Sequence, residues 1–259
     1  MDTHFILTNA RSGSNFLVNT INKHPAAVNY GELIGDWNMT ERLYQKFLKH
    51  MLTREQYLEY LLSGMLPYYS AQLVSCLSHV KQKIPVNFKF RNKLKTIGFK
   101  DFVPLIERYS LQSILTKENR KVIHLYRSNI IQRYISWLIL EDTKVASSTS
   151  GRFQYKVNID LSRAMEQIRE VDAQERLGVK LMESVPAGNK LSIEYETYFS
   201  SPESTAAING KVFELLGLDP IEEVSSHKKM GSDNLESRIS NYGEFVQLLK
   251  GSAYEKYLN

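Results

Sequence analysis

The stretch FILTNARSGSNFLVNTI, residues 5–21, decides the fold class. Its apolar start, Phe5–Leu7, is typical of a short buried strand, and its end, from Phe16 to Ile21, carries apolar residues at helical spacing. A polar loop, residues 9–15, joins the two. A strand, a tight loop and a helix form the arrangement with which α/β proteins bind phosphate, because unpaired N–H groups at the helix start face the ligand. The loop lacks the Gly-Lys pair of a nucleotide-triphosphatase P-loop, so the pattern alone leaves the phosphate compound open.

The rest of the chain alternates buried-strand and helical patterns, which predicts an α/β fold with a parallel sheet covered on both faces. We expect one domain over residues 1–259. In such a sheet, ligands bind at the carboxyl ends of the strands. The expected strands are His4–Thr8, Thr96–Lys100, Lys121–Tyr126, Lys190–Tyr195 and, as a weaker candidate, Ala27–Tyr30. The expected helices are Ser14–Lys23, Thr40–His50, Arg54–Met65, Tyr69–Gln82, Asn129–Leu140, Leu161–Glu183, Ser204–Leu216 and Gly243–Leu249.

Composition narrows the function classes. Lys and Arg (33) exceed Asp and Glu (28) by five, an excess that suits an anionic ligand but is too small to indicate nucleic acid. One cysteine, Cys76, excludes an intrachain disulfide framework, and the six histidines form no ligand-spaced cluster, so we expect no metal. No apolar run approaches the ~18 residues of a membrane span. The first strand is expected to begin near Thr3, so we expect no signal peptide and a cytoplasmic location.

Five loop residues can wrap a phosphate. Arg11 supplies positive charge, Ser12 lies beside it, Gly13 allows close backbone approach, and Ser14 and Asn15 add a hydroxyl and an amide. The alternative is a surface turn in which Ser14 or Asn15 only caps the helix.

Two further strand ends carry charged residues. Glu32 lies among apolar neighbours in VNYGELIGD, where it could act as a general base, and Lys100 ends the strand in TIGFKDF, where it could stabilise developing charge. The alternatives are an ordinary surface or capping glutamate and a solvated lysine.

The stretch KVIHLYRSNIIQRYISWLIL, residues 121–140, ends a strand at Arg127 and continues as a helix that is apolar except for one stripe. If that stripe faces a cleft, Arg127 and Ser136 can converge on one anion. The alternative is that Ser136 bonds to the carbonyl one turn back while Gln132 and Arg133 lie in solvent. The stripe comprises Asn129, Gln132, Arg133 and Ser136.

Two later segments are more ambiguous. Tyr195, at a strand end, could pack in the core or stack against a base. The stretch HKKMGSDNLESRISNYGEF, residues 227–245, could be a lid or plain surface, and residues 146–151 read as a flexible loop.

Taken in order, the motifs ARSGSNFL, GELI, GFKDF, LYRSN…YISW, IEYE and RISNYGEF resemble those of sulfotransferases that use 3′-phosphoadenosine-5′-phosphosulfate (PAPS). The similarity is to the bacterial carbohydrate and small-molecule type, with features shared by tyrosylprotein sulfotransferases, and runs from residue 3 to about 250. It implies a P-loop-like parallel sheet flanked by helices, with a helical insertion on the acceptor side.

The resemblance also implies roles for the candidate residues. Residues 11–15 would hold the 5′-phosphosulfate, Glu32 would be the catalytic base, and Arg11 and Lys100 would stabilise the bridging oxygen during in-line, metal-free transfer that leaves 3′-phosphoadenosine-5′-phosphate (PAP). Two departures from the family pattern stand out: the Arg127-to-Ser136 spacing is one residue longer than in hormone-type enzymes, and their Arg-Lys-Gly motif is absent. The nucleotide contacts implied are Arg127 and Ser136 at the 3′-phosphate, Tyr195 at the adenosine and Arg238 closing over the 3′-phosphate.

The aromatic-rich region 36–92 is expected to roof the acceptor site, with a glycan or a small-molecule alcohol as acceptor. Two rival functions stay open: a kinase with a degenerate P-loop, which would need a Mg²⁺-binding Ser or Thr directly after a lysine, and a non-catalytic nucleotide-binding module. The module would need neither Glu32 nor Lys100. The sequence does not address the oligomeric state.

Overall fold

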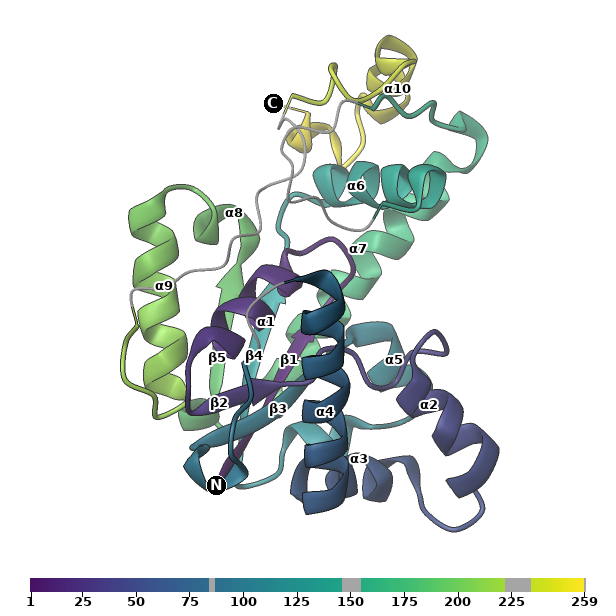
Figure 1. Cartoon of the computed structure of the whole chain (residues 1–259). Helices are drawn as coiled ribbons and strands as arrows, with labels where there is room; N and C mark the ends of the chain where they lie inside the picture. The colour runs from purple at the N-terminus through teal and green to yellow at the C-terminus, as the bar shows by residue number, and fades with distance from the viewer. Residues whose placement is uncertain (84–86, 146–154, 222–233, 259) are drawn as a thin grey trace.

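The computed structural model describes residues 1–83, 87–145, 155–221 and 234–258 (Figure 1). Its centre is a five-stranded sheet in the order β2-β3-β1-β4-β5, in which every pair of neighbours is parallel. The α/β prediction is confirmed, and the weak strand candidate near residue 27 is the edge strand β2. The strands are β1 (Asp2–Thr8), β2 (Ala27–Asn29), β3 (Thr96–Phe102), β4 (Arg120–Tyr126) and β5 (Lys190–Glu194).

Helices connect the strands, and none in the described part of the chain is long and apolar enough to cross a membrane. The predicted loop at 146–151, and residues 227–233 of the second loop, lie outside the described residues. The α-helices are α1 (Ser14–Lys23), α2 (Met39–Leu43), α3 (Arg54–Ser63), α4 (Met65–Gln82), α5 (Val103–Arg108), α6 (Ile130–Thr143), α7 (Leu161–Glu183), α8 (Tyr195–Tyr198), α9 (Pro202–Leu215) and α10 (Tyr242–Leu249). A π-helical turn, η1 (Tyr44–Leu48), and the 3₁₀ turns η2 (Arg91–Lys93), η3 (Gln112–Leu115), η4 (Ala187–Asn189) and η5 (Glu255–Tyr257) complete the elements.

Several predicted boundaries differ from the structure: the helix expected over 40–50 is α2 followed by the π-helical turn η1, the helix expected over 129–140 extends to Thr143, and three further boundaries differ for local reasons. The helix expected over 54–65 ends at Ser63, because Gly64 stands in extended backbone at its C-cap. α4 begins four residues earlier than expected, since Pro67 falls in its first turn, where no intrahelical N–H is required. Tyr195, expected to end a strand, instead begins the short helix α8.

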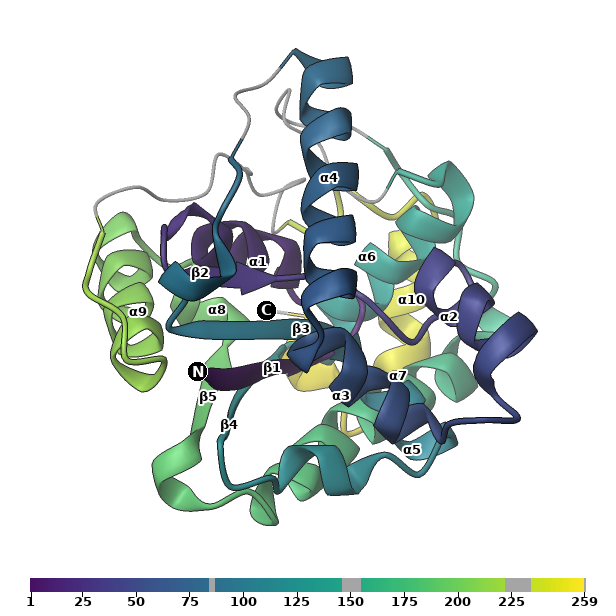
Figure 2. The same ribbon diagram turned by 60° about the horizontal axis from the view of Figure 1, so that its bottom comes forward.

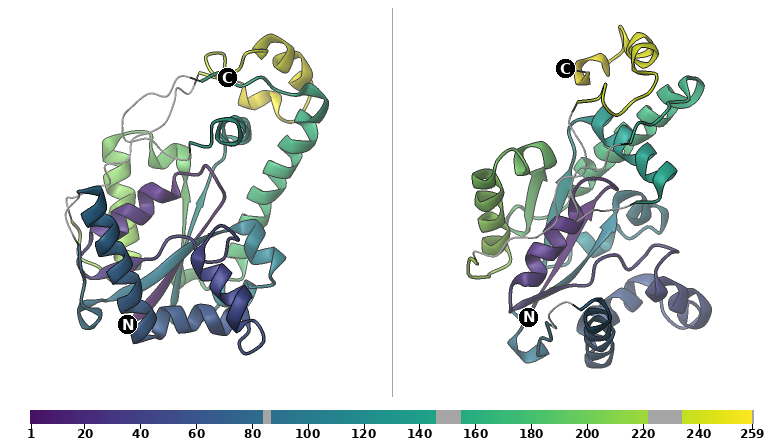
Figure 3. Two further views of the ribbon diagram at one scale, coloured as in Figure 1. Left: turned by 45° about the vertical axis from the view of Figure 1, so that its right-hand side comes forward. Right: turned by 45° about the horizontal axis from the view of Figure 1, so that its top comes forward.

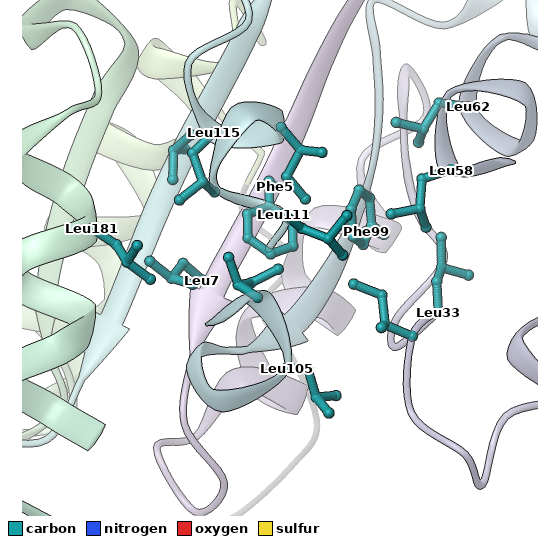
Figure 4. Close-up of a cluster of buried hydrophobic side chains, with 14 of the residues drawn as sticks. Phe5, Leu7, Leu33, Leu58, Leu62, Phe99, Leu105, Leu111, Leu115 and Leu181 are labelled. Atoms are coloured by element: carbon teal, nitrogen blue, oxygen red, sulfur yellow. The ribbon is translucent and has the colours of Figure 1, made fainter. Parts of the chain in front are cut away.

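The sheet buries both faces, as expected for parallel strands. In β1, Phe5 and Leu7 point to one face and pack with Phe99 and leucines of α3, α5 and α7 (Figure 4). The intervening Ile6 points to the opposite face, in a cluster with residues of α1 and α9. Figure 3 shows these two sets of helices on either side of the strands.

A third hydrophobic cluster lies beyond the carboxyl ends of the strands. It joins α6 and the first half of α7 to residues 235–258, which include α10 (Figure 1). A parallel bridge between Val157 and Ile239 ties these segments together. This cluster places the C-terminal segment, with Arg238, above the sheet edge where the predicted ligand site lies.

The strand order defines a switch point between β1 and β4. The connection after β1 leads to β2 on one side of the sheet, whereas the connection after β4 leads to β5 on the other. Loops that diverge in this way leave a crevice at the carboxyl ends of the two strands. The loop 9–15 follows β1 and Arg127 follows β4, so both lie where this crevice is expected.

Because Gly98 in β3 has no side chain, the side chain of His4 in β1 can lie over it and reach Asn29 in β2. The imidazole of His4 lies over Gly98 and contacts Thr96 Oγ1 (Nδ1, 2.8 Å) and Asn29 Nδ2 (Nε2, 3.1 Å). Burial, with a smaller effect of Arg120, lowers the pKa of His4 to about 3, so the ring is neutral at pH 7. Asn29 in turn accepts from the N–H of Gly31 (2.9 Å), which precedes Glu32.

We expect Gly98→Ala to destabilise the protein by about 2–3 kcal/mol or more, since the packed sheet has no room for an added methyl. A Cβ at residue 98 would overlap the carbonyl oxygen of His4 and lie 2.5 Å from its ring carbons. Urea denaturation followed by circular dichroism measures the change. Gly210→Ala in α9 is the matched control: apart from neighbouring residues and the backbone of its own helix, no heavy atom of the described residues lies within 4 Å of the new Cβ, and the change should stabilise the helix by up to about 1 kcal/mol. Equal unfolding midpoints for the two variants would contradict this account.

Candidate active site

The loop between β1 and α1 requires two left-handed residues. Arg11 has φ 70° and Gly13, the N-cap of α1, has φ 77°. A Cβ on Gly13 would lie 2.8 Å from the Phe199 ring and 3.0 Å from the Tyr195 ring, so glycine is needed for space as well as for conformation. No described side chain caps α1, which argues against the capping alternative for Ser14 and Asn15. Ser12 is fully buried, and its hydroxyl makes no hydrogen bond with a described residue.

Lys100 joins the loop to Glu32. Its Nζ lies 2.5 Å from Glu32 Oε1 and donates to Asn15 Oδ1 at 3.2 Å. Only 3% of the Lys100 side chain is exposed, compared with 24% of Glu32, so the solvated-lysine alternative is wrong. The structure thus brings together three of the predicted residues: Asn15 from the first turn of α1, Glu32 from the loop after β2, and Lys100 from β3.

Asp101, next to Lys100, fixes the backbone that carries Glu32. Its Oδ2 accepts from the N–H groups of Leu33 (2.9 Å) and Ile34 (2.8 Å), directly after the glutamate. Burial raises the pKa of Asp101 to about 7; the two N–H donors oppose this shift and the charge of Glu32 adds to it. The residue was not singled out from the sequence, because its only signal was its place beside Lys100.

Trp37 borders the other oxygen of Glu32. Its indole Nε1 donates to Glu32 Oε2 at 2.6 Å, while 55% of the residue remains exposed. The indole lies over Gly35, where any Cβ would overlap the ring, and its centroid is 6.0 Å from that of Phe102. Trp37 belongs to the aromatic region predicted to roof the acceptor site, and it is the member that reaches Glu32.

A second charged group forms where β4 and β5 end. The Arg127 guanidinium lies 4.3 Å from the Tyr195 ring centroid and pairs with Glu196 (Nε to Oε1, 3.3 Å). Glu196 also accepts from the N–H and hydroxyl of Ser128 (3.0 and 3.1 Å) and so caps the turn into α6. One face of the Tyr195 ring is therefore covered by Arg127.

Arg11 connects the two groups. Its Nε donates to Ser136 Oγ at 3.0 Å, and its carbonyl oxygen accepts from Arg127 Nη1 at 3.4 Å. Burial, and then the charge of Arg127, lower the pKa of Arg11 from its ordinary value. An anion bound between these guanidinium groups would reduce their mutual repulsion.

The polar stripe of α6 faces the loop and the C-terminal segment. Gln132, Arg133 and Ser136 are all buried, which overturns the solvent-facing alternative. Gln132 Oε1 accepts from Arg238 Nη1 at 2.8 Å, so Arg238 reaches the same helix face one turn before Ser136. The predicted residues Arg11, Ser136 and Arg238 thus meet along one side of α6.

Arg133 was not a predicted site residue, yet it holds the backbone of the loop after β1. Its Nε donates to the carbonyl of Ala10 (3.2 Å) and its Nη1 to that of Val171 (2.8 Å), and it pairs with Glu175 at 3.1 Å. Burial raises the pKa of Glu175, while the charge of Arg133 opposes that rise. Its place in the stripe was the only sequence signal, because nothing along the chain indicated that α7 would supply its partner.

The described residues contain no group of three or more His, Cys, Asp or Glu side chains that could hold a metal ion. The ionic groups at this end of the sheet comprise three cations, Arg11, Lys100 and Arg127, and two carboxylates, Glu32 and Glu196, that pair with Lys100 and Arg127. A site of this kind can bind an anion and, through Glu32, accept a proton.

We expect the pH dependence of stability to change in Asp101→Asn. A carboxyl whose pKa rises from 3.8 to about 7 on folding contributes stability that is complete below about pH 4 and lost as the pH rises through 7. Relative to the Asn variant, the wild type should therefore lose about 4 kcal/mol between pH 4 and pH 8. Urea denaturation of both proteins across this range measures the difference. If the free energies of unfolding of the two proteins differ by the same amount at every pH, the pKa shift is refuted. The size of such a constant difference would report only the changed hydrogen bonds.

No model of a known protein family matches the sequence, and no curated protein matches it. Solved structures do, and three of them are sulfotransferases. The sulfotransferase from Alicyclobacillus acidocaldarius is 12% identical with a TM-score of 0.48, and the match covers 100% of this chain and 96% of that one. The sulfotransferase domain of a Synechococcus olefin synthase is 19% identical (TM-score 0.45; 85% and 74% covered). The sulfotransferase domain from the curacin biosynthetic pathway is 14% identical (TM-score 0.45; 85% and 75% covered).

Proposed function

We propose that this chain is a sulfotransferase that moves a sulfuryl group from PAPS to a hydroxyl or amine of an acceptor, which is a glycan or a small-molecule alcohol. The observation that carries the proposal is the position of Lys100, whose ammonium contacts both Asn15 at the start of α1 and the carboxylate of Glu32. A group passing from an anion held by the loop to an acceptor activated by Glu32 would pass beside this charge. Positioning and electrostatic stabilisation are the main contributions that such a transfer needs.

The donor would bind at two points. The loop 11–15, with the first N–H groups of α1, suits the 5′-phosphosulfate. Arg127 and Ser136, linked through Arg11, suit the 3′-phosphate, and Arg238 lies on the same side of α6. Because Arg127 covers one face of Tyr195, contact between this ring and the adenosine would use the other face or the ring edge.

In the proposed reaction, the acceptor oxygen or nitrogen forms a bond to sulfur while the bond from sulfur to the bridging oxygen of the 5′-phosphate breaks. Glu32 takes the acceptor proton, Lys100 and Arg11 stabilise the charge that grows on the bridging oxygen, and PAP leaves with that oxygen. Atoms and electrons balance without a metal or a redox partner.

Both oxygens of Glu32 have partners in the structure, Lys100 on one and Trp37 on the other. For Glu32 to take a proton, one oxygen must become available. The donor would provide for this, because its negative charge near Asn15 competes with Glu32 for Lys100. The exposed ring of Trp37 would then border the acceptor.

The proposal predicts which nucleotide stabilises the fold. A ligand that binds only the native state raises the melting temperature according to its concentration relative to its Kd. We expect PAP to raise it without added metal, and ATP with Mg²⁺ to raise it much less, because the loop lacks both the P-loop lysine that binds the β- and γ-phosphates and the Ser or Thr after it whose hydroxyl holds Mg²⁺. Differential scanning fluorimetry measures both shifts. A larger shift with Mg-ATP would indicate a kinase and refute the proposal. The absence of a shift with either nucleotide would also refute it.

Arg127→Ala tests whether Arg127 contacts the 3′-phosphate of PAP. The substitution should weaken PAP binding by about 2–3 kcal/mol, the size expected for a lost charge-assisted contact to a phosphate. It should barely change the affinity for AMP, which has no 3′-phosphate. Arg176→Ala on the exposed surface of α7 is the matched variant and should bind both nucleotides normally. Equal losses for PAP and AMP in Arg127→Ala would make Arg127 a structural residue.

We expect Glu32→Gln to lower turnover roughly 100-fold or more while leaving PAP affinity nearly intact, because glutamine can accept a hydrogen bond from Lys100 but cannot take a proton. Transfer of labelled sulfate from PAPS to a panel of sugars and alcohols measures turnover, and calorimetry measures PAP binding. The exposed Glu203→Gln variant should match the wild type in both measurements. Near-normal turnover of Glu32→Gln would remove Glu32 from the mechanism.

A further inference from the structure

The outward face of α4 is apolar, the reverse of the usual pattern for a surface helix. At 100° per residue, four exposed apolar residues fall on one stripe, opposite the buried Tyr68 and Gln72 that attach the helix to the protein. In Figure 1, α4 runs across the front of the molecule, and in Figure 2 it stands out from the body. The stripe consists of Leu66 (74% exposed), Leu73 (60%), Leu77 (62%) and Val80 (65%).

The apolar surface continues beside the helix. Phe88 stacks on Tyr69 of α4 with ring centroids 6.3 Å apart, and Phe90 packs edge-on against Phe88 at 5.2 Å. Phe88 is 43% exposed and Phe90 is 55% exposed. A contiguous exposed surface of this kind marks an interaction site more often than chance exposure does.

The charge of this segment has a single sign. Between Glu59 and Asp101 the chain has no acidic residue, but it has seven lysines and arginines. Lys81, Lys83 and Lys93 are exposed, and the ammonium of Lys93 lies 6.0 Å from the Phe90 ring centroid. Cations therefore border the apolar stripe with no carboxylate of the same segment to neutralise them.

We propose that α4 docks on an anionic lipid surface, with its apolar stripe among the headgroups and its bordering lysines against the lipid phosphates. This binding does not depend on the function proposed above. A second copy fits less well, because a symmetric pairing of α4 would bring the lysines of both copies together.

Sedimentation of the full chain with vesicles tests the proposal. We expect the protein to pellet with phosphatidylcholine vesicles that contain phosphatidylglycerol, and to pellet far less with phosphatidylcholine alone or at high salt. Leu73→Ser with Leu77→Ser should weaken binding at least about tenfold, and Lys81→Gln with Lys83→Gln should weaken it less and reduce its salt dependence. Val179→Ser on α7, 51% exposed, is the matched control and should bind as the wild type does.

The proposal would be overturned if the wild type did not bind anionic vesicles, or if the wild type and the Leu73/Leu77 variant bound them equally well. It would also be overturned if light scattering showed that the wild type is a dimer and the variant a monomer, while neither protein bound vesicles. The last outcome would assign the surface to a second copy. Because the four substituted side chains are exposed, circular dichroism should show an unchanged fold in each variant.

Discussion

The buried pair between Lys100 and Glu32 is the interaction around which the site is organised. A lysine whose side chain is only 3% exposed requires a charge partner, and Glu32, whose side chain is 24% exposed, supplies it. The surrounding sheet fixes both members: Asp101 and Asn29 hold the backbone on either side of Glu32, and β3 holds Lys100. In the proposed reaction an anion at the loop would replace Glu32 as the partner, which would couple anion binding to release of the carboxylate.

The second charged group follows a different principle. Arg127 and Arg133 are held from behind by carboxylates, Glu196 and Glu175, and both guanidinium groups donate to carbonyls of the β1 loop. These contacts set the loop conformation and keep positive charge at the crevice. Arg11, which contacts Ser136, connects this group to the loop. A ligand with two anionic groups would therefore meet Lys100 with one of them and the group around Arg127 with the other.

The fold could be predicted from the sequence because β1, β2, β3 and β4 are largely buried and most helices are long and periodic. The differences lie where these signals are short: α5 has six residues, and β5, which is mostly only half-buried, passes directly into α8 at Tyr195 with no glycine or proline between them. The site could be predicted only in part. Positions at strand ends indicated Glu32 and Lys100, whereas Asp101, Arg133 and Glu175 act through tertiary contacts that no spacing along the chain reveals.

Two helices, α6 and α4, depart from the usual amphipathic pattern in opposite ways, and both departures are informative. α6 is buried, so its polar stripe had to meet polar partners, and it does so at Arg11 and Arg238. α4 is exposed, so its apolar stripe has no reason in the folded chain to be apolar. The polar stripe of α6 is therefore satisfied within the chain, and through Arg11 it contacts the loop at which the proposed donor would bind. The apolar stripe of α4 stays in solvent in the described chain, and the proposed lipid surface would remove it from water.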